Sequence, residues 1–170
     1  MRIAAMCIRS ASCNAPEAAA KAPTPIKRRT PLSAIKALQT LCRIAKRNAD
    51  HFIARCPGDF TVPWDFDVPA GPDRIADSSA AAIAASGLWN LAELTFPVDP
   101  AGSARYRSAA LNLLASLLSA TYVAWNTPGW EGVLKHGVYH FHKKLGVDES
   151  VMWGEFFFLE AVDKVLKSTG

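Results

Sequence analysis

Apolar side chains recur at three- and four-residue steps in four segments of this 170-residue chain, which is the pattern of amphipathic helices. The first stripe is the clearest, and it leaves Lys46, Arg47 and Asp50 off the apolar side. Its members are Ile35, Leu38, Cys42, Ala45, Ala49 and Phe52. Proline and glycine after Cys56 end the pattern, because proline cannot continue the hydrogen-bond ladder of a helix. Helices are therefore predicted over residues 32–56, 78–95, 103–122 and 150–167.

The predicted helix at residues 78–95 differs from the others, since small and apolar side chains surround it almost completely. A helix without a polar face is expected to be buried on all sides. Asp77 or Ser78 suits the position before its first turn, where a side-chain oxygen accepts backbone N–H groups. We therefore expect neighbouring helices to approach this one closely.

Two long loops separate the helices. Residues 59–77 contain three prolines, and residues 126–150 are rich in glycine and aromatic residues. The second loop is expected to be irregular with some extended backbone, and no convincing strand alternation appears in it. The predicted class is all-α, built from helical hairpins with long loops at one end.

The charge of the chain is unevenly distributed. Six of the 19 basic residues but one of the 15 acidic residues lie in residues 1–30, so the rest has a net charge of −1. A nearly neutral body gives no support for a nucleic-acid partner. No apolar run approaches the roughly 20 residues that span a bilayer, so we expect a soluble protein without a membrane partner.

The first 31 residues show no sustained period and are predicted to be a disordered or non-homologous tail, followed by a domain at residues 32–170. The tail contains Arg and Ser and little acid, as a mitochondrial transit peptide does. The alternative is a tail that carries no targeting signal. We favour the second reading and a cytoplasmic protein. Two of the four cysteines, Cys7 and Cys13, lie in the tail.

The remaining two cysteines, Cys42 and Cys56, lie about 21 Å apart along the first predicted helix, too far for a disulfide. The four cysteines form no C-x-x-C pair and no zinc spacing. Free thiols in a reducing compartment are expected.

Two motifs carry a resemblance to a known family. They are VPWDFDVPAGPDRIADSSAAAIAASGLWNLAEL and, further on, GVLKHGVYHFHKKLGVDESVMWGEFFFLEAV. Together they resemble the C-terminal part of the unsaturated glucuronyl hydrolases, glycoside hydrolase family 88. The similarity covers roughly residues 40–165, and Glu155-Phe156 stands where Asp-Tyr is common in the family.

The resemblance implies an (α/α)6 barrel of six helical hairpins, of which this chain would hold about two. It implies release of a 4,5-unsaturated uronic acid from the non-reducing end of an oligosaccharide. In that reaction an aspartate protonates the sugar double bond and activates water. The family's two catalytic aspartates lie in earlier hairpins without counterparts here, so no catalytic residue is assigned and stand-alone activity is not expected. No cofactor and no metal are implied.

Trp64, Asp65, Phe66 and Asp67 form the most distinctive cluster of the sequence. An aromatic face suits the C–H surface of a sugar, and carboxylates suit its hydroxyl groups. Alternatively, the two aspartates form turns by accepting backbone N–H groups in a proline-flanked loop, which is the commoner use of such residues. Trp64 is the substrate-binding candidate of this cluster.

Three histidines followed by two acids suggest a metal site, but their spacing matches no known ligand set. The histidines and the lysines beside them suit contact with an anionic sugar group better than a metal ion. His140 and Lys144 are the candidates for this contact, and His142 and Lys143 could share it. The alternative is that these side chains are solvated loop residues without a binding role. The acids Asp148 and Glu149, with Ser150 as a cap, are expected to be structural groups at the start of the last helix.

Two classes of function remain open. The chain is either a member of the hydrolase family, with an unsaturated oligosaccharide as partner, or a non-catalytic helical protein that binds sugar or another chain. The related unsaturated rhamnogalacturonyl hydrolases are a third reading. Apolar helix surface left uncovered would favour self-association.

Overall fold

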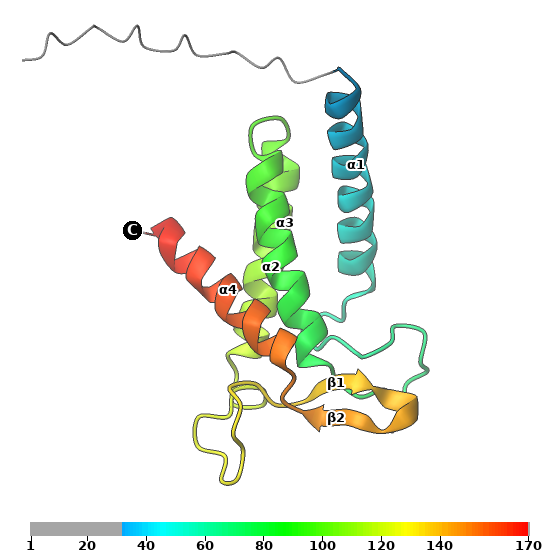
Figure 1. Cartoon of the computed structure of the whole chain (residues 1–170), viewed down its shortest axis with the longest axis vertical. Coiled ribbons are helices and arrows are strands. Elements are labelled where there is room, and N and C mark those ends of the chain that lie inside the picture. Colours follow the sequence, from blue (N-terminus) through cyan, green and yellow to red (C-terminus); the bar gives the residue numbers. More distant parts are fainter. Residues whose placement is uncertain (1–31, 170) are drawn as a thin grey trace, which may run out of the picture.

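The computed structural model describes residues 32–169 (Figure 1). Four helices dominate it, and the hairpin and loops gather at one end of them. The helices are α1 (Leu32–Arg55), α2 (Ser78–Thr95), α3 (Pro100–Leu117) and α4 (Met152–Thr169). The strands are β1 (Gly137–His140) and β2 (Leu145–Glu149), joined by the short 3-10 helix η1 (Phe141–Lys143). The predictions for the N-terminal tail concern residues outside this description.

Helix α2 lies at the centre and packs against α3 and α4, with α1 on a further side. Its alanines make close packing possible, because Ala82, Ala85 and Ala92 are completely buried. Gly154 of α4 completes this approach, since a Cβ atom on it would lie 2.9 Å from the Cβ of Ser79. The close approach expected from the small residues of α2 is therefore confirmed.

Helix α2 is apolar almost all round but is not buried on all sides, because about two hairpins cannot surround it. Ile83 is 41% exposed and Leu94 is 69% exposed, and Gly87 also faces outward. No element among residues 32–169 covers this part of α2, so its apolar surface meets solvent. Asp77 rather than Ser78 caps the helix, because the Asp77 side chain accepts a hydrogen bond from the backbone N–H of Ser79.

Helix α3 begins earlier and ends earlier than predicted. Pro100 occupies its first turn, where a missing N–H costs nothing, and Asp99 caps it by accepting from the Gly102 N–H. The chain leaves the helix after Leu117 and turns, so that Tyr122 is buried outside the helix. The apolar pattern in the sequence continues past Leu117 because residues of the following turn, such as Tyr122, also face the core.

A two-stranded antiparallel hairpin replaces the irregular loop expected before α4. Strands β1 and β2 pair Val138 with Val147 and His140 with Leu145. The register shifts between Gly137 and Val138, and a Cβ atom on Gly137 would lie 2.7 Å from the Glu149 carbonyl oxygen. Strands of four and five residues with an irregularity are too short for their alternation to stand out.

Helix α1 forms where predicted, but none of its residues is buried. Polar contacts hold it in place: Lys46 pairs with Asp99 at 2.6 Å, and the Tyr106 hydroxyl donates to Asp50 at 2.8 Å. Arg105 also pairs with Asp50. Near the end of α1, Ala49, Phe52, Ile53 and Cys56 pack partly against the core. None of the four helices is long and apolar enough to cross a membrane.

Candidate functional site

The loop before α2 and the hairpin before α4 meet at the start of α2, and Asp77 joins them. Its carboxylate Oδ1 accepts from the Ser79 N–H at 2.9 Å and the Ser79 hydroxyl at 2.7 Å, and from the Val138 N–H at 3.1 Å. The backbone N–H of Ser78 donates to the carbonyl of His136. Since Asp77 is 8% exposed, one buried carboxylate fixes both segments against the helix.

A pocket of about 240 Å³ opens beside this junction. Two of the residues singled out in the sequence, Trp64 and His140, line it together, although they come from different segments. The other lining residues are Asp77, Val138, Tyr139, Phe141 and His142.

Trp64 is held in one orientation by three contacts. Its indole N–H donates to the Asp73 carbonyl at 2.8 Å. Its ring stacks on Phe141, with centroids 4.5 Å apart and planes 15° apart, and meets His142 edge-on at 5.3 Å. Trp64 therefore offers the pocket an aromatic surface and no hydrogen-bond donor.

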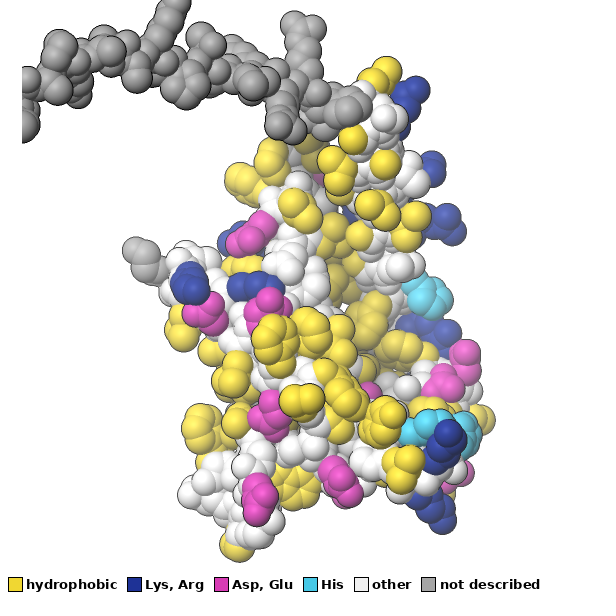
Figure 2. Space-filling model, viewed as in Figure 1, with side chains coloured by type: hydrophobic (Ala, Val, Ile, Leu, Met, Phe, Trp, Pro, Cys, Tyr) yellow, Lys and Arg dark blue, Asp and Glu magenta, His cyan; other side chains and the backbone are white. Residues whose placement is uncertain are grey.

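His140 and Lys144 stand at the two ends of η1. The Nδ1 atom of His140 accepts from the Lys143 N–H at 3.4 Å, so the neutral ring carries its proton on Nε2. Lys144 has a left-handed backbone with φ of 54° and lies exposed at the turn. It does not line the pocket with Trp64 and His140. Histidine and lysine side chains gather over this hairpin turn (Figure 2).

Of the two aspartates of the WDFD cluster, Asp65 takes the turn-forming role and Asp67 forms an ion pair instead. The Asp65 carboxylate accepts from the Asp67 N–H at 2.8 Å, and Asp67 pairs with Arg55. The hydrogen bond from Arg55 holds the pKa of Asp67 below its usual value. Neither carboxylate lines the pocket of Trp64.

A second, larger pocket of about 770 Å³ lies between the end of α3, the 59–77 loop and the hairpin. His136 and Asp148 line it and pair with each other, and both have a φ of 62°. Burial raises the pKa of the neighbouring Tyr122 hydroxyl, against a hydrogen bond with Thr61 that lowers it. The pairing of His136 with Asp148 was missed because only the hairpin brings the two residues together.

The roles expected at the start of α4 need correction. Asp148 and Glu149 belong to β2 and lie before the helix, which begins at Met152. Ser150 does not act as a helix cap: its hydroxyl donates to the Leu134 carbonyl and accepts from the Trp130 indole N–H at 2.7 Å. The residues Gly146 to Glu149 pair with β1 as part of a strand, so the helix start that Asp148, Glu149 and Ser150 suggested does not form there.

Comparison with known proteins supplies an identification. No family model matches the chain. The unsaturated glucuronyl hydrolase of Bacillus sp. (strain GL1) is 38% identical over 122 residues, which are 72% of this chain and 32% of the relative. The unsaturated chondroitin disaccharide hydrolase of Streptococcus pneumoniae (strain ATCC BAA-255 / R6) is 36% identical over 118 residues, 69% of this chain and 29% of the relative.

Solved structures agree with these sequence matches. The crystal structure of the Bacillus sp. GL1 enzyme superposes with a TM-score of 0.71 at 34% identity, covering 80% of this chain and 36% of that one. The chain is homologous to part of the unsaturated glucuronyl hydrolases of glycoside hydrolase family 88. A Streptococcus agalactiae glucuronyl hydrolase variant in complex with dGlcA-GalNAc6S gives a TM-score of 0.69 at 30% identity, covering 80% of this chain and 35% of that one.

The four helices accordingly match a part of the (α/α)6 barrel of the unsaturated glucuronyl hydrolases, and the chain spans about a third of the length of these relatives. Glu155 has a clear structural role here. Its carboxylate accepts from the Val133 N–H at 2.9 Å and the Leu134 N–H at 3.0 Å. This side chain fixes the loop before the hairpin to α4.

Within residues 32–169, no group of three or more His, Cys, Asp or Glu side chains is arranged to hold a metal ion. Cys42 is exposed and Cys56 half-buried, and both are free thiols. The side chains that line the Trp64 pocket supply aromatic surface, imidazole groups and the carboxylate of Asp77.

Proposed function

We propose that the 59–77 loop and the β1–β2 hairpin form one wall of the sugar pocket of a glycoside hydrolase acting on unsaturated uronosides. Trp64, His140 and Lys144 contact the sugar in this proposal. The observation that carries it is the shared pocket of Trp64 and His140 in a chain homologous to unsaturated glucuronyl hydrolases. Relatives of known structure include a complex with the unsaturated disaccharide dGlcA-GalNAc6S.

Each of the three side chains would make a different kind of contact with the sugar. The stacked rings of Trp64 and Phe141 give a rigid apolar surface for the C–H face of a sugar ring. His140 can donate from Nε2 to a hydroxyl or carboxylate oxygen. Lys144, at the exposed turn, supplies a positive charge on a flexible stem that can reach the uronate carboxylate or a sulfate group.

In this proposal the Trp64 pocket does not supply the proton transfer of the family's reaction. Protonating an enol-ether carbon near neutral pH needs a carboxylic acid held within hydrogen-bond reach of the sugar, with a raised pKa. The carboxylate of the Trp64 pocket is Asp77, whose Oδ1 atom is already occupied by three donors that fix the fold. We therefore assign this chain a binding role and expect no turnover from it alone.

Binding of the unsaturated disaccharide dGlcA-GalNAc tests the proposal. The indole N–H resonance of Trp64 should shift on titration, and Trp64→Ala or His140→Ala should weaken the affinity at least tenfold. Trp125→Ala is the matched control, because Trp125 is 75% exposed and lies outside the pocket. An equal loss for Trp125→Ala, or no binding at all, would contradict the proposal.

Turnover is followed in the same samples through the ultraviolet absorbance of the unsaturated sugar, which should stay constant. Loss of absorbance that is abolished by Asp65→Asn or Asp67→Asn would overturn the binding-only assignment. It would make the WDFD loop a catalytic site.

A further inference from the structure

Asp77 touches both walls of the Trp64 pocket close to the two side chains proposed to bind sugar there. Its backbone N–H donates to the Val62 carbonyl at 2.8 Å, and its Oδ1 atom accepts from the Val138 N–H at 3.1 Å. Val62 stands two residues before Trp64, and Val138 stands two residues before His140. Asp77 therefore fixes the backbone beside each candidate, and among the described residues that line the pocket it alone carries a carboxylate.

The two carboxylate oxygens of Asp77 have different surroundings. Oδ1 accepts from the Ser79 N–H, the Ser79 hydroxyl and the Val138 N–H, whereas Oδ2 accepts no hydrogen bond from residues 32–169. No side-chain oxygen that is fully buried in this part of the chain lacks a partner. Oδ2 is therefore accessible, although Asp77 as a whole is 8% exposed. Because Asp77 lines the pocket, the accessible surface of Oδ2 borders the space that a ligand would fill.

An oxygen in this position selects the group that lies against it. A carboxylate oxygen is an acceptor only, and leaving it without a donor in a partly desolvated site costs free energy. A ligand hydroxyl can donate to it, and such a charge-assisted hydrogen bond is roughly twice as strong as a neutral one. A second anionic group would be repelled. The position therefore suits a hydroxyl group and excludes a carboxylate or a sulfate.

We propose that Asp77 is a further sugar-binding residue, whose Oδ1 atom holds the two walls of the pocket together while Oδ2 accepts a hydrogen bond from a sugar hydroxyl. The inference rests on the proposed function and adds an orientation to it. A hydroxyl-bearing edge of the sugar lies against Asp77, and the anionic group points away from it, toward the histidine and lysine side chains of the hairpin turn.

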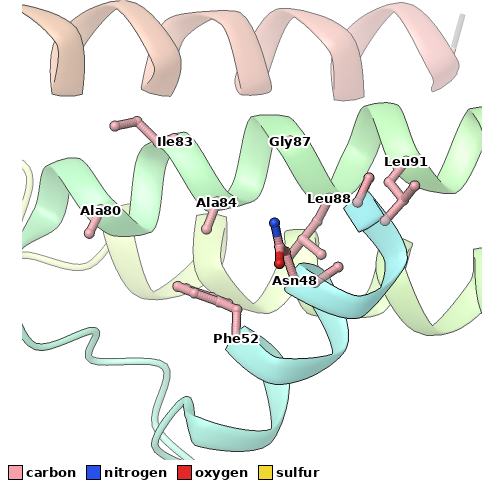
Figure 3. Close-up of a pocket in the computed structure, with 10 residues that line it drawn as sticks. Asn48, Phe52, Ala80, Ile83, Ala84, Gly87, Leu88 and Leu91 are labelled. Carbon is pink, nitrogen blue, oxygen red and sulfur yellow. The ribbon is translucent and has the colours of Figure 1, made fainter. Parts of the chain in front are cut away.

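The apolar groove of about 520 Å³ between α1 and α2 shows the opposite character (Figure 3). Asn48 is the polar side chain among its lining residues, and Phe52, Ala84 and Leu88 give it an apolar wall. The Trp64 pocket instead combines stacked aromatic rings with a carboxylate oxygen. A sugar ring has an apolar C–H face and a polar edge, so it needs both kinds of surface.

Asp77→Asn separates the two oxygens. The amide oxygen of Asn can accept from the donors that Oδ1 serves, and Asn is as good a helix cap as Asp. The amide nitrogen replaces Oδ2 by a donor, so the affinity for dGlcA-GalNAc should fall about tenfold. The Trp64 indole N–H resonance of the ligand-free 170-residue chain should stay at its wild-type position. Asp99→Asn is the matched control, because Asp99 caps α3 in the same way and lies outside the pocket. It should leave the affinity unchanged.

Asp77→Ser removes both roles at once. A serine hydroxyl can still cap α2, but it is shorter and offers a single oxygen, so it cannot also serve the Val138 N–H. The affinity should fall further than with Asp77→Asn, and the Trp64 resonance of the ligand-free chain should move. An Asp77→Asn variant that moves this resonance and lowers the melting temperature as much as Asp77→Ser does would limit Asp77 to holding the fold and overturn the inference.

The outcomes also distinguish this inference from the proposed sugar wall. If Trp64→Ala weakens binding while Asp77→Asn binds as tightly as the wild-type chain or more tightly, the sugar wall stands and the role of Oδ2 is refuted. If the wild-type chain does not bind dGlcA-GalNAc, the sugar wall itself is refuted. A tenfold loss in Asp77→Asn, with an unmoved Trp64 resonance and an unaffected Asp99→Asn control, would support both.

Discussion

Helices α1 and α3 both carry apolar residues at helical spacing, yet their surroundings differ completely. Leu113 and Leu117 of α3 are at most 1% exposed, while no residue of α1 is buried. Helix α3 lies against α2 with complementary small residues, whereas α1 is attached through the ion pairs of Lys46 and Asp50 and the partial packing of its last turns. An apolar stripe therefore indicates where a helix can be buried, and a partner surface decides whether it is.

Truncating one leucine in each helix should give the largest contrast. Leu113→Ala removes a fully buried side chain and should lower the free energy of unfolding by about 2–5 kcal/mol. Leu38→Ala, at a position 58% exposed, should change it by less than about 0.5 kcal/mol. Urea unfolding followed by circular dichroism measures both. Similar losses for the two variants would show that the α1 stripe is buried in solution.

Two glycines sharpen the same comparison with changes of opposite sign. Gly154→Ala forces a Cβ atom to 2.9 Å from Ser79 at the α2–α4 contact and should cost about 1–3 kcal/mol. Gly87→Ala adds its methyl group in open space on the uncovered part of α2 and should stabilise the chain by about 0.5–1 kcal/mol. Thermal melting of the two variants checks the signs, and destabilisation by Gly87→Ala would mean that this face is covered.

The smallest effect is expected at the polar attachment of α1. Asp50 is partly desolvated, which raises its pKa, but hydrogen bonds from Tyr106 and Arg105 outweigh this and hold the pKa below the ordinary value of 3.8. Because the folded pKa is depressed, the contribution is fully present above the unfolded pKa and is lost as the pH falls through the folded value. Asp50→Asn should cost no more than about 1 kcal/mol at pH 7, since the side chain is 46% exposed.

Melting curves between pH 2 and pH 7 test this linkage. The difference between the wild-type chain and Asp50→Asn should narrow as the pH falls below about 4. Asp163→Asn is the control, because Asp163 forms an exposed pair with Lys167 one turn further along α4. A difference that stays constant over this range would show that Asp50 is not held by its charged partners.

The helices could be predicted well from the sequence, because their signals are local. The predicted ends of α1 and α2 agree with the structure to within one residue, and proline, glycine and Asp77 explain where these helices stop or start. The end of α3 was misplaced by five residues, since Tyr122 and Val123 are buried by a turn that has the same apolar pattern as a helix. The hairpin was missed because a strand pair depends on its partner.

In the candidate site, too, features with a local sequence signal could be predicted and features that depend on distant contacts could not. Trp64 and His140 could be singled out by residue type and by the family motifs, and the structure brings them into one pocket. Lys144 was grouped with them because it is close in sequence, but the left-handed turn at its backbone leaves it outside that pocket. The pairing of His136 with Asp148 had no local signal, since its two members meet only across the hairpin.

The sequence by itself determined the helical class, the bounds of α2 and the family relationship, because periodicity, capping chemistry and motif order are properties of neighbouring residues. The tertiary structure decided which apolar faces are covered, how the two loops meet at Asp77 and which side chains share a pocket. These features depend on contacts between distant segments, and the free energy of such a contact exists only when both surfaces are present. The same amphipathic pattern thus produced a buried helix in α3 and an uncovered one in α1.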